Sequence, residues 1–338
     1  MHALVTGATG LIGRHLVAVL AANGVEICAY VRPSTNRRPL KSYPIKYVVG
    51  TASDEVAMLQ AVAGVDFVFH VAGYLTANAP FGTDGNSGAD EWPLYQAVNV
   101  DFTAKLLAAS LDAQVGRFVY VSSSSVYSLD APVPTPEDAP LAPLSLYGRS
   151  KLQAEAHVQQ AQKQGLATTI IRPPVAYGPG DRYFTPMALR LARLPLLPLV
   201  NGGRTLMDMV YVQDVAELLW LCGQREAANG RIYNAGPGYH TSLFDLVAAY
   251  RELTGSGPRI VSVRSEMAGR TAWLSRRLVR PFVPEASAAL TPAGLNLMNH
   301  DLHLDMTRAA ADLNFTPRYS LLEGLRATIN QEYLKGRF

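Results

Sequence analysis

The chain has 338 residues, of which 49% are hydrophobic and 17% are charged, and its net charge is +3. This length suits one large domain or two smaller ones, and the composition allows a substantial core. The small net charge argues against a nucleic-acid partner, and no apolar run reaches the roughly 18–20 residues of a membrane span. With two isolated cysteines and no leader-like N-terminus, the sequence predicts a soluble, cytoplasmic protein.

Strand-like and helix-like segments alternate over the first half of the chain. We expect strands at 2–6, 25–31, 47–49, 66–71 and 117–122, and helices at 11–22, 55–63 and 94–110. Such alternation predicts an α/β fold with a Rossmann-type, doubly wound parallel sheet. Ligands bind these sheets at the carboxyl ends of the strands.

The second half of the chain departs from this alternation. A proline-rich loop at 130–143 precedes a helix at 145–163 and a strand at 168–172. Strands at 209–212 and 231–234 are expected to return to the sheet. These segments suggest a dinucleotide-binding domain and a smaller, mostly C-terminal α/β substrate domain. We assign the first to residues 1–174 and 207–236, and the second to residues 175–206 and 237–338.

A glycine-rich turn joins the first strand to the first helix. Gly7, Gly10 and Gly13 stand in the run Thr-Gly-Ala-Thr-Gly-Leu-Ile-Gly. Glycine lets the backbone approach a pyrophosphate, and the start of a helix supplies free N–H groups for it. Between a strand and a helix at the beginning of the chain, this pattern predicts a dinucleotide site.

The end of the second strand bears on the choice between NAD and NADP. An acidic residue there would bond the ribose 2′-hydroxyl, whereas an arginine favours a 2′-phosphate. This chain has Arg32 at that point, with Arg37 and Arg38 just beyond and no carboxylate. We therefore expect NADP(H) as the preferred cofactor, with NAD as the alternative.

Tyr147 and Lys151 are four residues apart, so they share one face of the expected helix. A free tyrosine titrates near pH 10, and a nearby ammonium is expected to lower that pKa. A cluster of serines at 122–125 follows a strand and could hold a substrate oxygen. With the glycine turn, these residues predict a phenol that moves a proton while a nicotinamide moves a hydride.

Taken together, these motifs resemble the extended short-chain dehydrogenases/reductases, also described as NAD-dependent epimerases/dehydratases. The resemblance covers most of the chain and includes residues 66–73, 99–100 and the Arg-Pro-Pro…Tyr-Gly-Pro-Gly-Asp run at 172–181. It implies that Tyr147 is the catalytic acid/base and that Lys151 binds the nicotinamide ribose and tunes the tyrosine. It also implies a homodimer built from the helices at 94–110 and 145–163.

The resemblance implies roles for further residues. Ser123 best fits the catalytic serine, Ser124 is the alternative, and Asn99 links the helix to the catalytic site. Thr51 stands where the family often has an aspartate that contacts the adenine. Besides Arg32, Tyr147 and Lys151, the implied cofactor-binding residues are Gly7, Thr9, Gly10, Leu11, Ile12, Gly13, Thr51, Ala52, Val71, Ala72, Gly73, Pro173 and Val175.

Departures from the family pattern bear on the substrate. Family dehydratases typically carry Asp-Glu after the catalytic serine, where Ser124 and Ser125 stand here. Nucleotide-sugar enzymes often have asparagine where this chain has Pro174, and arginine where it has Met207. Methionine cannot pair with a phosphate. The run around Met207 is closer to the 3β-hydroxysteroid dehydrogenase and dihydroflavonol reductase branch.

The substrate side of the sequence is apolar, which fits either a ligand pocket or the ordinary core of a small domain. Residues 183–200 are rich in leucine and proline, and a later apolar stretch contains Trp273 and Phe282. Ser124, Tyr183 and Met207 are the expected substrate contacts. We expect an NADP(H)-dependent oxidoreductase that interconverts a ketone and a secondary alcohol on an apolar small molecule of steroid, terpenoid, aryl or β-keto type.

Other functions remain open at this point. One is a nucleotide-sugar 4-epimerase with tightly bound NAD, and another is a non-catalytic dinucleotide sensor, although a sensor has no need of proton-transfer residues. The alternating His and Asp residues at 299–305 could suggest a metal site. The alternation also fits an exposed strand, and the family chemistry needs no metal, so we expect none.

Overall fold

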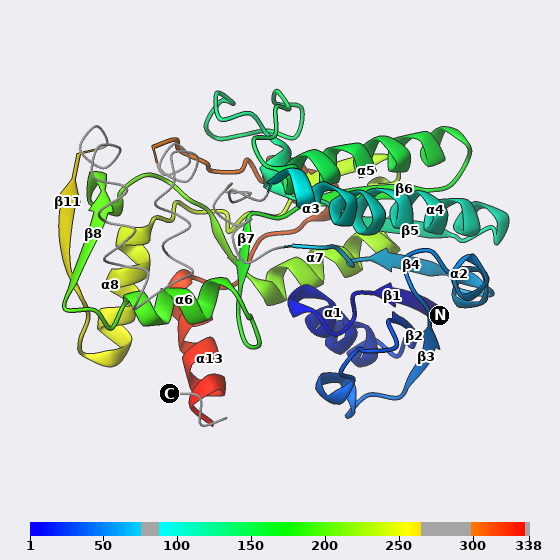
Figure 1. Ribbon diagram of the computed structural model, residues 1–338, viewed down its shortest axis with the longest axis horizontal. Helices are drawn as coiled ribbons and strands as arrows, with labels where there is room; N and C mark the ends of the chain where they lie inside the picture. Colours follow the sequence, from blue (N-terminus) through cyan, green and yellow to red (C-terminus); the bar gives the residue numbers. More distant parts are fainter. Residues whose placement is uncertain (76–87, 265–298, 335–338) are drawn as a thin grey trace.

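A computed structural model of the chain is built around a seven-stranded parallel sheet with the order β10-β6-β5-β4-β1-β2-β3 (Figure 1). The structure describes residues 1–75, 88–264 and 299–334. The strands of this sheet are β1 (His2–Thr6), β2 (Glu26–Val31), β3 (Ile45–Val49), β4 (Phe67–His70), β5 (Arg117–Val121), β6 (Thr168–Arg172) and β10 (Arg231–Asn234). The predicted Rossmann-type sheet is thereby confirmed.

Helices cover both faces of the sheet. One face packs against α1 (Leu11–Ala22), α7 (Val212–Gln224) and α12 (Thr307–Leu313), and the other against α2 (Glu55–Val62), α4 (Phe102–Asp112) and α5 (Leu146–Lys163). Each face has its own apolar core, and α1 lies directly against α7. On the other face α4 lies beside α5. The homodimer expected through these two segments stays a prediction.

The helix predicted at 94–110 is interrupted. The chain instead forms α3 (Gly88–Tyr95), a π-helical segment at Gln96–Asp101, and then α4. The π-helical segment holds Asn99 in a buried position. Short π-helical segments inside α-helices often occur at functional sites. Hydrophobic periodicity alone did not indicate the interruption.

One strand predicted to return to the main sheet does not do so. β9 (Met209–Tyr211) pairs with β7 (Val175–Tyr177) in a separate two-stranded sheet. The main sheet has no place for β9 beside β6, because β6 already pairs with β5 on one side and β10 on the other. The return of β10 is confirmed. β7 and β9 come from ranges assigned to different domains, and the proposed domain boundaries stay a prediction.

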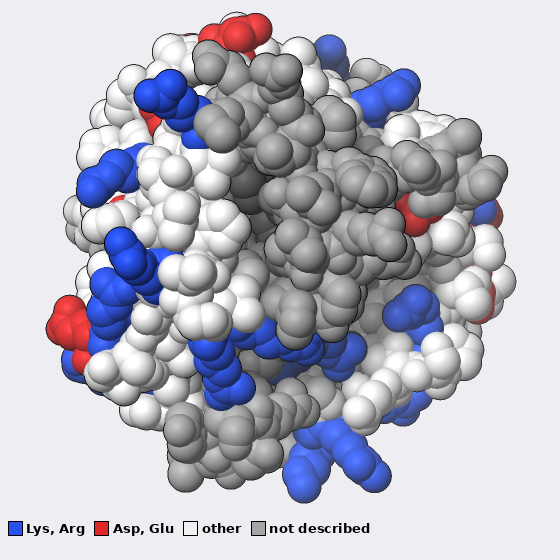
Figure 2. All heavy atoms as spheres, turned by 60° about the vertical axis from the view of Figure 1, so that its left-hand side comes forward, with Lys and Arg blue, Asp and Glu red and all other residues white. Residues whose placement is uncertain are grey.

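The remaining elements gather at the end of the molecule farthest from β2 and β3 (Figure 1). They are α6 (Phe184–Leu191), β8 (Leu196–Val200), α8 (Leu243–Thr254), β11 (Arg259–Val263) and α13 (Leu321–Leu334). β8 and β11 form a two-stranded parallel sheet. On the face shown in Figure 2, basic side chains are spread more widely than acidic ones. Trp273 and Phe282 lie outside the described residues.

Within the described part of the chain, no helix is both long enough and apolar enough to cross a membrane. The longest helix that the structure describes is α5, whose buried side combines small and apolar residues with Lys151 and Glu155 and whose other side carries polar residues. This amphipathic pattern is typical of a helix that packs on a globular core.

Candidate active site

A cavity of about 750 Å³ lies along the carboxyl ends of the central strands. Its lining includes every residue that the sequence analysis assigned to cofactor or substrate binding, together with Ser123. Asn99 is the exception among the expected site residues, since it is buried behind the cavity wall. Residues separated by up to 200 positions in the sequence therefore meet in one site. Their individual roles stay predictions.

The glycine turn has the geometry that a dinucleotide phosphate needs. Gly7 has a φ of +68°, and a Cβ there would lie 2.7 Å from the backbone nitrogen of Ala72. A Cβ on Gly13 would lie 2.2 Å from the Gly7 carbonyl oxygen. α1 begins at Leu11, and its N-cap residue Gly10 has no side chain to cap it, so the first N–H groups of the helix remain available to a ligand in the cavity. The residues present thus fit the pyrophosphate of a nicotinamide dinucleotide.

The end of β2 forms the part of the cavity expected to hold the adenosine. Arg32 is exposed and lines the cavity, and Arg37 stacks on the Tyr47 ring at 4.8 Å. The Tyr30 hydroxyl donates a hydrogen bond to the Thr51 carbonyl oxygen at 2.8 Å. Between residues 30 and 35 and between 50 and 52, the cavity lining contains no carboxylate. This composition favours a ligand that carries negative charge.

Tyr147 and Ser123 meet at the start of α5. The Ser145 hydroxyl caps the helix by accepting a hydrogen bond from the Gly148 N–H at 3.0 Å. A Cβ on Gly148 would lie 2.3 Å from the Ser125 carbonyl oxygen, so glycine lets the helix press against the serine segment. The Ser123 and Tyr147 side chains are hydrogen-bonded to each other. The contact favours Ser123 over Ser124, which lines the cavity without this bond.

Lys151 lies one turn further along α5 and is almost completely buried. Its Nζ donates a hydrogen bond to the Val121 carbonyl oxygen at 2.5 Å and lies 4.5 Å from the centre of the Tyr120 ring. Burial lowers the pKa of Lys151 to about 7, although the Glu155 carboxylate opposes this shift. The lysine can therefore change its charge near neutral pH.

The pKa of Tyr147 differs from the sequence-based expectation. Burial raises the pKa of Tyr147 to about 12, and the hydrogen bond with Ser123 opposes the rise only partly. The expected lowering by the Lys151 ammonium is wrong for this structure, because desolvation disfavours the charged forms of both side chains. At neutral pH the tyrosine is therefore a phenol that can donate its proton.

Lys151 also makes the stability of the protein depend on pH. Its pKa is about 7 when folded and 10.5 in the reference state, so the unfolded chain binds more protons between these values. This group's contribution to the free energy of unfolding therefore rises with pH across that window. We expect the stability advantage of Lys151→Met over the wild type to be largest at pH 6 and to shrink by pH 10. Urea unfolding at several pH values measures it, and a constant advantage would contradict the assignment.

Asn99 is buried behind the cavity wall and bonds to residues on two neighbouring segments. Its Oδ1 accepts a hydrogen bond from the Tyr74 N–H at 2.6 Å, and its Nδ2 donates to the Tyr74 carbonyl at 3.1 Å and to the Ser150 hydroxyl at 2.9 Å. These bonds tie the π-helical segment to α5 and to the strand end after β4. These contacts are compatible with the expected role of Asn99 as a link between the helix and the site, which stays a prediction. Tyr74, which lines the cavity, was not identified from the sequence, although it directly follows Gly73.

Glu155, one turn after Lys151 on α5, forms a buried ion pair with Arg172. Arg172, at the end of β6, donates two hydrogen bonds to the Glu155 carboxylate, at 2.9 and 2.6 Å, and both side chains are 1% exposed. Ser122 donates a third bond to Glu155 at 2.5 Å. Arg172 also donates a hydrogen bond to the Tyr127 hydroxyl, and this hydroxyl donates to Asn234 Oδ1, so the network extends to β10. Glu155 thus joins α5 to the ends of β5 and β6.

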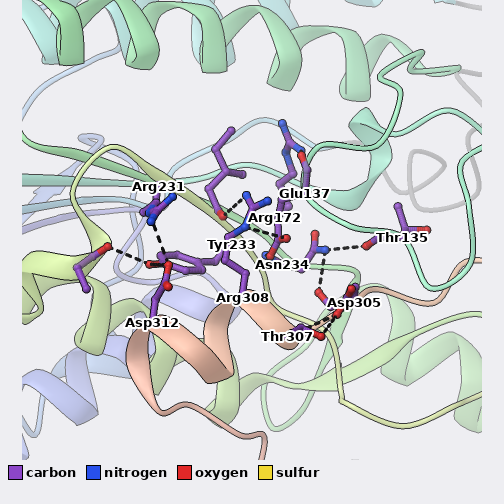
Figure 3. Close-up of polar contacts among 12 residues, drawn as sticks. Thr135, Glu137, Arg172, Arg231, Tyr233, Asn234, Asp305, Thr307, Arg308 and Asp312 are labelled. Atoms are coloured by element: carbon purple, nitrogen blue, oxygen red, sulfur yellow. Dashed lines mark hydrogen bonds and ion pairs between the residues drawn. The ribbon is translucent and has the colours of Figure 1, made fainter.

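The network reaches the C-terminal part of the chain through β10 (Figure 3). The Asn234 side-chain amide donates to the carbonyl oxygens of Thr135 and Asp305, at 2.9 and 3.0 Å. Its backbone N–H donates to Glu137, whose carboxylate lies 3.4 Å from Arg308. These contacts anchor the proline-rich loop and residues 302–305 beside the cavity.

Residues 302–305 are not the exposed strand that their alternation suggested. Leu302 bridges to Met207 and Leu304 to Thr135, and Leu304 is 1% exposed. His303 Nδ1 lies 2.9 Å from Asp208 Oδ1, a pair that the sequence did not reveal. Within the described residues, no group of three His, Cys, Asp or Glu side chains could hold a metal ion. Of this segment, Leu302 lines the cavity, next to His300 and Asp301.

Comparison with known proteins identifies the family. The NAD dependent epimerase/dehydratase family matches residues 3–236. A 4-hydroxy-2-methyl-3-oxo-4-farnesyl-3,4-dihydroquinoline-1-oxide ketoreductase from Stigmatella aurantiaca is 28% identical over 97% of this chain and 95% of its own. A 2-alkyl-3-oxoalkanoate reductase from Stenotrophomonas maltophilia (strain K279a) is 29% identical, over 96% of this chain and 98% of its own.

Two solved structures also resemble this chain over nearly its whole length. The crystal structure of gox2253 has a TM-score of 0.80 and 27% identity, covering 99% of both chains. MoeE5 in complex with UDP-glucose and NAD has a TM-score of 0.75 and 27% identity, also covering 99% of both chains. The chain therefore belongs to the NAD dependent epimerase/dehydratase family, the extended short-chain dehydrogenases/reductases, and is an NAD(P)-dependent enzyme that acts on CH–OH or C=O groups.

Proposed function

We propose that the protein is an NADP(H)-dependent oxidoreductase that interconverts a ketone and a secondary alcohol on an apolar small molecule. The observation that carries the proposal is the cavity, in which the bonded Ser123 and Tyr147 side chains face walls rich in leucine. These walls include Leu199, Leu206 and Leu302. Apolar walls with a few converging polar groups are typical of sites for apolar ligands.

The arrangement supports a specific division of roles in reduction. A bound nicotinamide supplies the hydride. Tyr147, a phenol at neutral pH, protonates the carbonyl oxygen, and Ser123 holds that oxygen by a hydrogen bond. Lys151, within one turn of Tyr147 and half protonated near pH 7, stabilises the phenolate that remains. In the oxidation of an alcohol the same groups act in reverse.

The names of two relatives support an apolar carbonyl substrate. One is a ketoreductase whose named substrate carries a farnesyl group, and the other reduces 2-alkyl-3-oxoalkanoates. The test is the oxidation of NADPH in the presence of steroid, terpenoid, aryl and β-keto carbonyl compounds, with UDP-sugars assayed alongside. We expect turnover with at least one ketone. Turnover of UDP-sugars alone would reject the proposal.

The preference for NADP(H) rests on Arg32 and on the lack of a carboxylate near it in the cavity lining. We expect Arg32→Ala to weaken NADPH binding by about 10- to 100-fold, the value of a hydrogen bond to a charged group, and to leave NADH binding nearly unchanged. Fluorescence titration with both cofactors measures this. Arg259→Ala removes an exposed arginine from β11 and serves as the charge-matched control. Equal losses for NADPH and NADH would contradict the assignment.

A nucleotide-sugar 4-epimerase is the second candidate. Its support is the likeness to MoeE5, whose structure contains UDP-glucose and NAD. Met207 argues against it, because it lines the cavity where the family often places an arginine for the nucleotide phosphate. Purified protein that carries stoichiometric NAD and is stabilised against heat by UDP-sugars would favour the epimerase.

A further inference from the structure

A second, smaller cavity adjoins the far end of the main one. Its volume is about 40 Å³, and Phe184, Leu199 and Leu243 line both cavities. The remaining walls come from β7, α6 and the residue after it, β8, α8 and α13, and they are almost entirely apolar. We call this second cavity the annex. Three side chains thus separate it from the space that holds Ser123 and Tyr147.

The boundary between the two cavities depends on a glycine. Gly203 has a φ of +74° and lines the main cavity. A Cβ on Gly203 would lie 2.5 Å from Leu199 Cδ1 and 3.4 Å from the Leu243 Cβ. Any larger residue would displace the Leu199 side chain and would press against Leu243. The chain therefore leaves Leu199 and Leu243 room at the junction.

Thr185 differs from the other residues that line the annex, because it is a threonine whose buried hydroxyl has no hydrogen-bond partner. It lines this cavity, is 5% exposed, and its side-chain hydroxyl has no hydrogen-bond partner. Its backbone N–H, by contrast, bonds to Asp181 Oδ2 at 2.6 Å. A buried hydroxyl without a partner destabilises a protein, whereas a valine of the same shape would not. An unpaired hydroxyl beside an apolar void therefore points to a ligand that reaches it.

We propose that the annex receives the distal end of the substrate, and that the Thr185 hydroxyl pairs with an oxygen atom there. The inference rests on the proposed function and narrows it. The substrate is then an elongated apolar molecule, with its reacting carbonyl at Tyr147 and a second hydrogen-bonding group at the far end of its apolar arm. The arm passes between Phe184, Leu199 and Leu243, and burial of its methylene groups drives binding.

Ala192→Leu tests the annex. Ala192 lines the annex but not the main cavity, so leucine fills only the smaller space. We expect kcat/KM for NADPH-dependent reduction of long-chain ethyl 3-oxoalkanoates to fall at least about tenfold, and that for ethyl 3-oxobutanoate to change less than about twofold. Ala113→Leu, at the exposed end of α4, is the matched control. Equal losses for short and long ketones, or no loss, would overturn the proposal.

Thr185→Val tests whether the Thr185 hydroxyl pairs with a ligand oxygen, and the measurement is ligand binding instead of turnover. The probes are 1-decanol and 1,10-decanediol, whose binding is followed by the rise in the unfolding temperature at saturating NADPH. We expect the wild type to bind the diol about tenfold more tightly than the alcohol, and Thr185→Val to lose this difference. Ala192→Leu should respond weakly to both probes. Identical responses from the wild type and both variants would refute the annex.

The two assays separate the inference from the function on which it rests. If the protein reduces ketones with no dependence on the length of the apolar arm or on residue 192, the oxidoreductase proposal is kept and the proposal for the annex is rejected. Selective binding of the diol without reduction of any ketone would keep the annex and reject the ketone chemistry. If Ala192→Leu fails to fold, Ala188→Val fills the same cavity with a smaller side chain.

Discussion

Tyr147→Phe is expected to lower ketone turnover by at least about 100-fold, because a positioned acid/base contributes about 10²- to 10⁴-fold to catalysis. The variant keeps the buried ring and removes only the hydroxyl that bonds to Ser123. The dissociation constant for NADPH should change less than about twofold. Turnover is measured as NADPH oxidation with the best ketone of the panel, and cofactor binding by fluorescence titration.

The control for Tyr147→Phe is Tyr43→Phe, which removes a phenolic hydroxyl outside the cavity lining. It should keep wild-type turnover. Turnover in Tyr147→Phe at more than about a tenth of the wild-type rate would reject the tyrosine as proton donor. A large loss of NADPH affinity in the same variant would instead indicate a damaged cofactor site.

Glu155→Leu is expected to lower the free energy of unfolding by about 3–5 kcal/mol. Glu155 and Arg172 are each 1% exposed, so removing the carboxylate leaves a buried guanidinium without its partner. The double variant Glu155→Leu/Arg172→Met should recover most of the loss, because it removes both charges and keeps apolar volume. Urea unfolding at pH 7 measures the three proteins.

An exposed ion pair provides the comparison for Glu155. Lys105 Nζ lies 2.9 Å from Glu55, but the two side chains are 37% and 67% exposed. Glu55→Gln should therefore cost less than about 1 kcal/mol. If the double variant is as unstable as Glu155→Leu, the loss comes from the bond to Ser122 and from packing, and the buried charge is not its main cause.

Local patterns predicted most of the main sheet. One example is the strand at residues 2–6, which is followed directly by the glycine turn and a helix. The conformation of each of these segments depends mainly on residues close to it in the sequence. The pairing of β9 with β7 could not be predicted this way. A strand pattern shows that a segment will pair but does not show its partner, and here β10 took the edge beside β6.

The site shows the same division between local and distant information. Tyr147 and Lys151 were predicted because a four-residue spacing on one helix is a local property. The Asp208 and His303 pair joins residues 95 positions apart, and no spacing within either segment indicates that the two side chains meet. The pKa of Tyr147 was predicted in the wrong direction, because spacing reveals a nearby charge but not the burial that outweighs it.

The packing of α1 against α7 has a consequence for synthesis of the protein on the ribosome. The buried apolar face of the helix that follows the glycine turn includes Leu16 and Leu20, and this core is completed by Val215 and Leu218 of α7. About 200 residues must be translated between the two helices. Throughout that interval the nascent chain exposes an apolar stripe, which chaperones recognise and which promotes aggregation. This half of the core is therefore completed late, only after α7 has been synthesised.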